Sequence, residues 1–513
     1  MEEKHVHFGG AFEAEDPALG DKRVRAHGQR PPGAAKNFLE GYTDSPEFSR
    51  FPNPVVHKNQ EGDDDEDDYI APPKFANYQS PMDRPKADPL EYRRLASFGA
   101  HLQTKATLLF EGFNGARLPG LRGIASALVV LTHLARAWDG ELFSSTSSED
   151  APPRLLQLPY LRILIQGRIG VTIFAFVTGY VCALKPIKLC RQGNQEAALA
   201  SISKSALRRV PRLVLPAAAA TAASWAMAEM GLYAVAKHQD SWWIDVQSSR
   251  RIAYLGEAVG NLVYNIVTTW TRSMNEYDNN QWTLLPLLRG SIWVYAFMVG
   301  TAYVKPRYRM MASFGLWVYF YCASDSAFGM QFFWGTLLAD LQNHPPTTQF
   351  ISDRARLCKV LSFTLVLTGL TFASFPEGHA EWMAWSRVLL DMMRPVLPEN
   401  PDFPRFGSGI GLELIALGVL LSPWLQRALS SRYLLFLGRM SFADEQGAMV
   451  ITRLKYPGNL TLIAWQLVWL PMVYGIAHLW MAHVDPWCDR MTNKLVEYVR
   501  LEASEKPPVL PGR

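Results

Sequence analysis

Cysteine is scarce in this chain, with five residues among 513 and no closely spaced pair of the kind that holds zinc. Three of the five fall in or beside apolar segments, so we expect small buried thiols rather than disulfides, and no metal site. The net charge of +4 is too small to indicate a nucleic-acid partner. The N-terminus, MEEKHVHFGG, has no apolar stretch typical of a signal peptide, so we expect the first hydrophobic helix to direct its own insertion.

Residues 1–107 lack the apolar periodicity of a folded domain. They are polar and rich in proline, and they include the acidic run Asp63–Asp68. Such a segment cannot bury enough apolar surface to offset the entropy that is lost on ordering. We therefore predict a disordered cytosolic tail over residues 1–107, in which the acidic run is solvated; a partner-binding tail is the alternative.

The rest of the chain contains long apolar runs that are nearly free of charge. A helix needs about 20 mostly apolar residues to cross a bilayer. The candidate spans are 119–137, 168–185, 212–236, 283–303, 310–324, 326–342, 358–375, 408–427 and 459–483, and a weaker one begins at Leu434. We predict an all-α, polytopic membrane helix bundle of about 9–10 transmembrane helices over residues 108–485, followed by a cytosolic tail over 486–513.

Basic residues are concentrated between the second and third predicted spans, where the segment contains seven Lys or Arg residues and a single acid, Glu196. Positively charged loops face the cytosol, so we predict that this segment is cytosolic. Successive loops lie on alternate sides of the membrane. This places the acid-bearing loops, such as the one that holds Glu377, on the non-cytosolic side. The same alternation places the N-terminus in the cytosol, in either the plasma membrane or an endomembrane.

The late segment LLFLGRMSFADEQGAMVITR, residues 434–453, is a poor span because it contains Arg439, Asp444, Glu445 and Arg453. Each charge at the middle of a bilayer costs on the order of 2.5–3.5 kcal/mol on insertion scales. Ten crossings fit the alternation of loop charges, whereas nine fit the hydropathy.

The first apolar helix, LPGLRGIASALVVLTHLARAW, contains an arginine and a histidine that are costly to bury. Arg122 and His133 are eleven residues apart, which at about 100° per residue is only about 20° from three full turns. Both therefore lie on one helix face, about 16 Å apart along the axis, and they do not touch. We expect Arg122 near the cytosolic surface and His133 deeper, toward the other side.

Each of these two residues has a structural and a functional interpretation. Arg122 is either a membrane anchor whose head reaches the polar surface or part of a binding site. His133 is either an interhelical hydrogen-bond partner or a functional group, because ionisable residues inside membranes usually line a cavity or pathway. Histidine is also the natural general base for a hydroxyl near neutral pH. Asp325 and Asp340 lie near predicted span ends, so we expect solvated helix caps rather than residues of a transport pathway.

Five stretches, taken in order, resemble the signatures of the membrane-bound acyltransferase 3 family. LPGLRGIASALVVLTHL resembles its Gly-Leu-Arg-Gly-Ile-Ala signature, and its Arg-x10-His spacing is matched by Arg122 and His133. The other stretches are GRIGVTIFAFVTGYV, ALRRVPRLVLP, QWTLLPLLRGS and FLGRMSF. Thr178 stands at a serine position of the second stretch, and Ser291 closes the fourth. The resemblance runs from about residue 108 to about residue 490.

The resemblance implies an O-acyltransferase that moves an acyl group, commonly from acyl-CoA, to a hydroxyl of a carbohydrate, lipid or small molecule. It implies His133 as the general base and Arg122 as a residue that holds the donor or stabilises charge. Arg208, Arg209 and Arg212 would bind the nucleotide phosphates, although they also suit topology anchors. No bound cofactor is implied, and the oligomeric state stays open.

Two departures from the family pattern keep other functions open. Leu287 stands where the fourth signature has a glutamate, and after Phe442 the chain looks as if about one span had been deleted. A catalytically impaired member that acts as a scaffold is therefore one alternative. A polytopic transporter is the other, although the sequence shows no paired inverted repeats.

Overall fold

The computed structural model describes residues 118–234, 248–399, 401–431, 433–434 and 459–499. The predicted N-terminal tail and nearly all of the predicted poor span at 434–453 lie outside the described residues, so these two predictions stay as they are.

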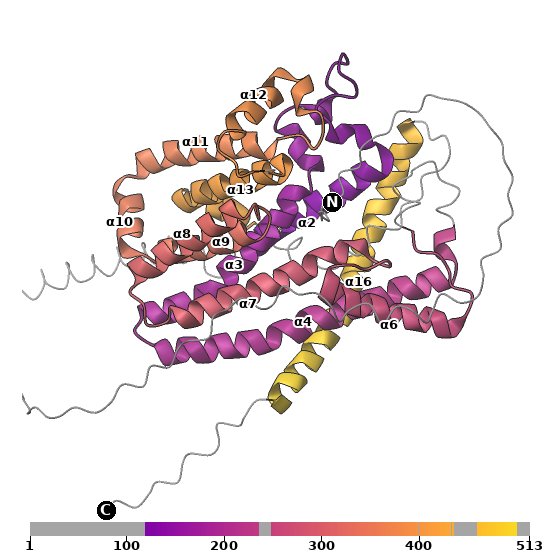
Figure 1. Ribbon diagram of the computed structural model, residues 1–513, viewed down its shortest axis with the longest axis horizontal. Coiled ribbons are helices and arrows are strands. Elements are labelled where there is room, and N and C mark those ends of the chain that lie inside the picture. The colour runs from indigo at the N-terminus through magenta and orange to yellow at the C-terminus, as the bar shows by residue number, and fades with distance from the viewer. Residues whose placement is uncertain (1–117, 235–247, 400, 432, 435–458, 500–513) are drawn as a thin grey trace, which may run out of the picture. The chain divides into compact units, whose positions relative to one another are not determined.

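Regular structure in the described residues is helical, and the predicted all-α class is confirmed (Figure 1). The α-helices are α2 (Leu118–Trp138), α3 (Arg168–Arg191), α4 (Gln195–Glu229), α6 (Leu255–Arg272), α7 (Leu284–Gly300), α8 (Pro306–Cys322), α9 (Gly329–Gln342), α10 (Pro345–Asp353), α11 (Ala355–Ala373), α12 (Ala384–Met393), α13 (Phe403–Leu421), α14 (Pro423–Leu429) and α16 (Asn459–Val499). Short 3₁₀ helices are η2 (Gly140–Phe143), η3 (Leu155–Gln157), η4 (Leu161–Ile165), η6 (Asn279–Thr283) and η7 (Ala380–Trp382).

Helix α3 is the centre of the bundle, in contact with α2, α4, α7, α9 and α13. Glycines let its neighbours approach closely. A Cβ atom built at Gly179 would lie 2.1 Å from the carbonyl oxygen of Phe332 on α9, and one built at Gly335 would lie 2.3 Å from that of Phe176. Small residues at helix interfaces permit such close backbone contact in membrane bundles.

Gly179→Ala should therefore destabilise the protein, by about 1–3 kcal/mol, because the added methyl group meets backbone rather than a movable side chain. Gly315→Ala is the matched control, because Gly315 lies within α8 with nothing within 4 Å of a built Cβ. It should be neutral or stabilise by up to about 1 kcal/mol. Thermal unfolding of both variants in detergent measures the difference; equal midpoints would contradict the packing account.

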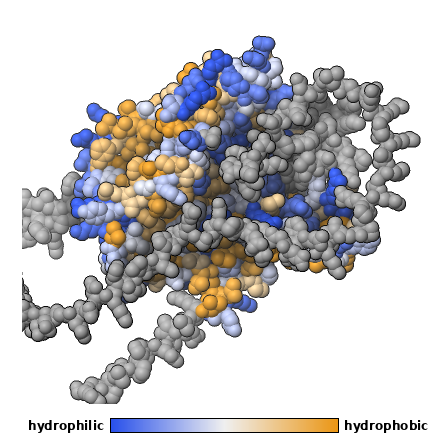
Figure 2. Space-filling model, in the orientation of Figure 1, coloured by the Kyte–Doolittle hydropathy of each residue, from blue (hydrophilic) through white to orange (hydrophobic). Residues whose placement is uncertain are grey.

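Four of the described helices are long and apolar enough to cross a membrane: Arg168–Arg191, Asn279–Gly300 (η6 with α7), Ala355–Ala373 and Phe403–Leu421. Each coincides with a predicted span. Large apolar side chains are exposed on α8 and α11, including Met311, Val360 and Phe363 at 66, 64 and 71%. Figure 2 shows apolar surface over α11 and its neighbours and hydrophilic surface near α12. A surface of this kind suits contact with lipid.

Other parts differ from the sequence predictions. The basic segment predicted as a loop is helical except for the turn at 192–194, so α3 and α4 form a tight hairpin. Helix α6 was not predicted, because its polar residues interrupt the apolar run that a span requires. Helix α16 continues to Val499, past the predicted domain boundary at 485.

The prediction that Asp340 is a solvated cap is wrong. Asp340 is 2% exposed and accepts hydrogen bonds from Arg309 on α8, at 2.6 and 3.1 Å, and from Arg191 on α3. We call this cluster the Asp340 end of the bundle. Asp325, in contrast, does cap a helix, because its carboxylate accepts from the backbone N–H groups of Phe328 and Gly329 at the start of α9.

Candidate active site

Helix α2, which carries both residues of the Arg-x10-His pair, packs antiparallel to the first half of α3. A Cβ built at Gly170 on α3 would lie 2.8 Å from the carbonyl oxygen of Ala125 on α2. Thr132 donates a 2.8 Å hydrogen bond to the carbonyl oxygen of Ile165, just before α3 begins. His133, the next residue, therefore lies level with the start of α3.

The other end of α2 lies level with the middle of α3. Leu121 lines an apolar cavity together with Phe176 and Tyr180 of α3 and with residues of α9, α13 and α14. Arg122 follows Leu121 and is exposed, whereas His133 is partly buried. The structure thus keeps the two residues at separate levels, about 16 Å apart along one helix.

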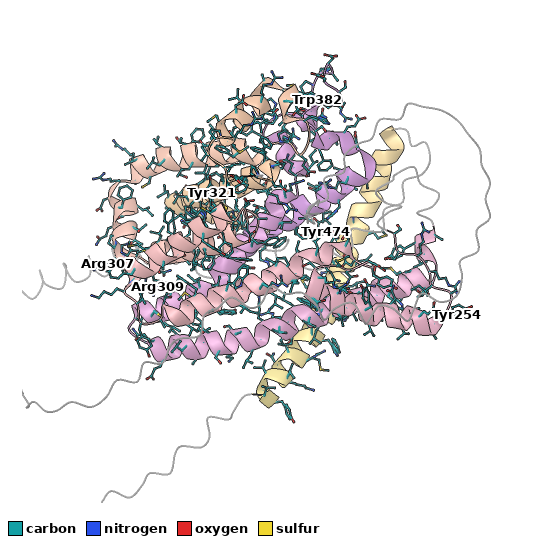
Figure 3. All side chains as sticks on the ribbon, viewed as in Figure 1. Tyr254, Arg307, Arg309, Tyr321, Trp382 and Tyr474 are labelled. Atoms are coloured by element: carbon teal, nitrogen blue, oxygen red, sulfur yellow. The ribbon has the colours of Figure 1, made fainter. Side chains whose placement is uncertain are left out.

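One turn beyond the histidine, an ion-pair cluster joins α2 to α3 and to the loop after α11. Arg136 donates to both carboxylate oxygens of Glu377, at 2.7 and 2.6 Å. Arg168, the first residue of α3, donates to Glu377 at 3.0 Å and to Asp402 at 3.2 Å. We call this cluster the Glu377 end. Figure 3 shows Trp382 near this end and Arg309 near the Asp340 end of the bundle.

Glu377 is ionised despite its burial. Burial by itself raises the pKa of this carboxyl group, but the positive charges of Arg168 and Arg136, and the hydrogen bonds that they donate, outweigh it and hold the pKa below its usual range. The carboxylate therefore persists at neutral pH, and would be lost only as the pH falls through this lowered pKa. At that point the two arginines would lose their common partner.

The segment between α2 and α3 is tied down over this end. Arg162 is fully buried and donates to the carbonyl oxygens of Phe143 and Ser144, at 3.0 and 3.2 Å. Gln166 donates at 2.7 Å to the carbonyl oxygen of Phe375, just after the end of α11. Residues 139–166 and the loop after α11 therefore form one hydrogen-bonded cap beside the end of α2 that carries His133.

Arg209 brings three of the sequence motifs together. Its guanidinium group donates to the hydroxyl of Ser291 on α7 at 2.9 Å and to the hydroxyl of Thr178 on α3 at 3.3 Å. Within the described residues, no carboxylate forms an ion pair with it. Leu287, at the place of the motif glutamate, lies one turn before Ser291 and packs against the apolar core.

The other two basic candidates on α4 lie apart from Arg209. Arg212 is exposed and pairs with Asp489 on α16 at 3.5 Å. Asp485, one turn earlier on α16, lies within electrostatic reach of both Arg212 and Arg122. Arg208 is partly buried. The structure thus places Arg122 and Arg212 near one carboxylate, whereas Arg209 points inward between three helices.

A further buried acid joins three helices elsewhere in the bundle. Glu413, within α13, is 4% exposed and accepts from the indole N–H of Trp317 on α8 at 2.9 Å and from the amide of Gln331 on α9 at 3.0 Å. These contacts explain how an acid is accommodated inside an apolar helix, and we assign them a structural role.

Sequence reasoning missed the cluster at the Glu377 end. Arg136 and Glu377 are 241 residues apart; Glu377 was taken only as part of the charge of a loop, and Arg136 was not singled out. The available signal was that Arg136 follows His133 by three residues, which makes the two side chains neighbours on the helix surface. Among the described residues, no group of His, Cys, Asp or Glu side chains could hold a metal ion.

The fold and the site together define a class of protein: a multi-pass membrane protein whose first described helix carries the Arg-x10-His pair. The family model described as an acyltransferase domain, that of acyltransferase 3, matches residues 116–443. The chain belongs to this family and is an acyltransferase, as the five stretches indicated. The match ends at residue 443, next to the predicted deletion after Phe442, whereas the resemblance was expected to run to about residue 490.

The chain is also similar to the O-acetyltransferase PaAT-1 of Phomopsis amygdali, with 27% identity over 64% of this chain and 70% of that protein. This similarity and the family match together support a membrane O-acyltransferase. No solved structure matches the chain.

Proposed function

We propose that this membrane O-acyltransferase takes an acyl group from acyl-CoA and transfers it to a hydroxyl of a carbohydrate, lipid or small molecule, with His133 as general base. The observation that carries the proposal is the family match across α2, the helix that holds both Arg122 and His133. The similar O-acetyltransferase supports a hydroxyl acceptor.

In the proposed step, the imidazole of His133 takes the proton of the acceptor hydroxyl while its oxygen attacks the thioester carbonyl carbon. The new C–O bond forms, the C–S bond breaks, and the proton passes from the imidazolium to the departing thiolate. This balances atoms and charge without any further reactant. The acceptor would reach His133 from the Glu377 end, which is the predicted non-cytosolic side.

The donor would enter at the other end of α2, where basic residues from two helices lie. Arg122, Arg208, Arg209 and Arg212 offer guanidinium groups, which suit phosphate oxygens. Of these, Arg209 has its direction set by the hydroxyls of Thr178 and Ser291, and no carboxylate among the described residues neutralises it. The separation of about 16 Å between Arg122 and His133 suits a donor whose phosphates and thioester are joined by a pantetheine arm.

Arg209→Gln should raise the KM for acyl-CoA by roughly tenfold to a hundredfold, because a hydrogen bond to a charged group contributes about 1.5–3 kcal/mol. The KM for the matching acyl-pantetheine, which lacks the nucleotide and its phosphates, should stay unchanged. Arg272→Gln, at the exposed end of α6, is the control and should change neither value. An equal effect of Arg209→Gln on both donors would contradict the phosphate-binding role.

A further inference from the structure

Arg136 connects His133 to Glu377. Arg136 follows His133 by three residues, so the two side chains are neighbours on the surface of α2. Its positive charge lies within electrostatic reach of the imidazole. The same guanidinium group is held by Glu377 through both carboxylate oxygens, at 2.7 and 2.6 Å. A single acid therefore binds the cation that lies within electrostatic reach of the candidate base.

The charges around this end of α2 leave Glu377 as the central acid. Arg168 at the start of α3 also donates to Glu377, and the charge of Arg162 on η4 lies within its reach. The outer groups pair among themselves: Asp402 with Arg168 and Arg405, and Asp139 with Arg154. Two guanidinium groups thus bind one carboxylate that is 11% exposed at its side chain, and a third lies within its electrostatic reach.

A general base must accept a proton, and nearby positive charge opposes this. If Glu377 were neutral, the charge of Arg136 would act on His133 without compensation. The imidazole would then bind a proton less readily, and would pull the proton of the acceptor hydroxyl less strongly. With Glu377 ionised, the Arg136–Glu377 pair is neutral as a whole.

We propose that Glu377 is a positioning residue that neutralises Arg136 and so preserves the basicity of His133 in acyl transfer. The inference rests on the proposed function, because it concerns the base of that reaction. Glu377 also holds the direction of Arg136 and Arg168, and through them the spacing of α2 and α3 at this end.

The test is the pH dependence of kcat/KM for acyl transfer by the full chain in detergent or liposomes. Loss of activity on the acid side reports protonation of the base. Glu377→Gln removes the negative charge and keeps an oxygen acceptor, so the acid limb should move to lower pH by roughly one unit and the plateau rate should fall. Arg136→Gln should move the limb to higher pH by a similar amount. The double variant should return it to within a few tenths of a unit of the wild-type position.

Asp402→Asn is the matched control. Asp402 belongs to the same cluster and pairs with Arg168, but it is 39% exposed at its side chain and has no bond to Arg136. Its replacement should leave the acid limb in place. A purely structural role for Glu377 would lower the rate equally at every pH, and a limb that does not move in Glu377→Gln overturns the inference.

Two further outcomes keep this inference separate from the proposed function. If Glu377→Gln does not fold, Arg136→Gln decides, because an unmoved limb in that variant also overturns the inference. If the wild-type chain transfers no acyl group, or if His133→Ala transfers at the wild-type rate, the proposed function itself fails, whatever Glu377 does.

Discussion

His133→Ala should lower the rate of acyl transfer by roughly 100- to 10,000-fold, the usual contribution of a general base. The residue lies on α2 level with the start of α3, partly buried and one turn before the Arg136–Glu377 ion pair. Alanine removes the proton acceptor and is well tolerated in a helix. The measurement is transfer of a labelled acyl group by the purified variant, with thermal unfolding as the check on folding.

His344→Ala provides the control for this prediction. His344 is the N-cap residue of α10, near the Asp340 end. Its backbone carbonyl oxygen accepts the first hydrogen bonds of the helix, and its side chain makes no capping hydrogen bond. It should keep wild-type turnover. A folded His133→Ala protein that transfers acyl groups as fast as the wild type would show that the histidine only joins helices.

Asp340→Asn should destabilise the protein by roughly 3–5 kcal/mol, which is the usual cost of removing one partner from a buried ion pair. Asp340 and Arg309 are 2% and 1% exposed, and Arg191 shares the same carboxylate. Asparagine leaves the buried guanidinium group of Arg309 and the partly buried one of Arg191 without this counter-charge, at the point where α3, α8 and α9 meet. Thermal unfolding in detergent should show a large decrease in the midpoint and a low yield of folded protein.

The exposed Asp353, at the end of α10, is the matched control. Its side chain accepts an exposed hydrogen bond from the hydroxyl of the neighbouring Ser352, so Asp353→Asn should change stability by less than about 0.5 kcal/mol. Equal unfolding midpoints for the two variants would mean that the cluster at the Asp340 end contributes no net stability.

The spans that sequence predicted best are those with apolar residues on every side. Helices α3, α7, α11 and α13 are long and apolar enough to cross a membrane, so hydropathy alone locates them. Helix α6 was missed because it is amphipathic, with buried polar residues such as Asn265 and Thr269 on its packed face. The α3–α4 hairpin was read as a loop because its charges were weighed as topology signals and as phosphate ligands, and not for helix formation.

The part of the candidate site that lies within one helix could also be predicted from the sequence. Eleven residues in one helix determine the geometry of Arg122 and His133, and local periodicity suffices to put them on one face. The partners of these residues come from distant segments. Asp340 was expected to be solvated because it lies near a predicted span end, and its two arginines lie 149 and 31 residues away in sequence. Sequence distance therefore limits prediction of ion pairs more than of helices.

The central claim is that this chain forms an acyl ester in a His133-dependent reaction. The most direct measurement replaces the native gene by a His133→Ala allele and compares the acyl esters of the two cells by mass spectrometry, at equal protein level. We predict that at least one hydroxyl-bearing compound loses its acyl group in the variant. Identical ester profiles in the two cells would contradict the account.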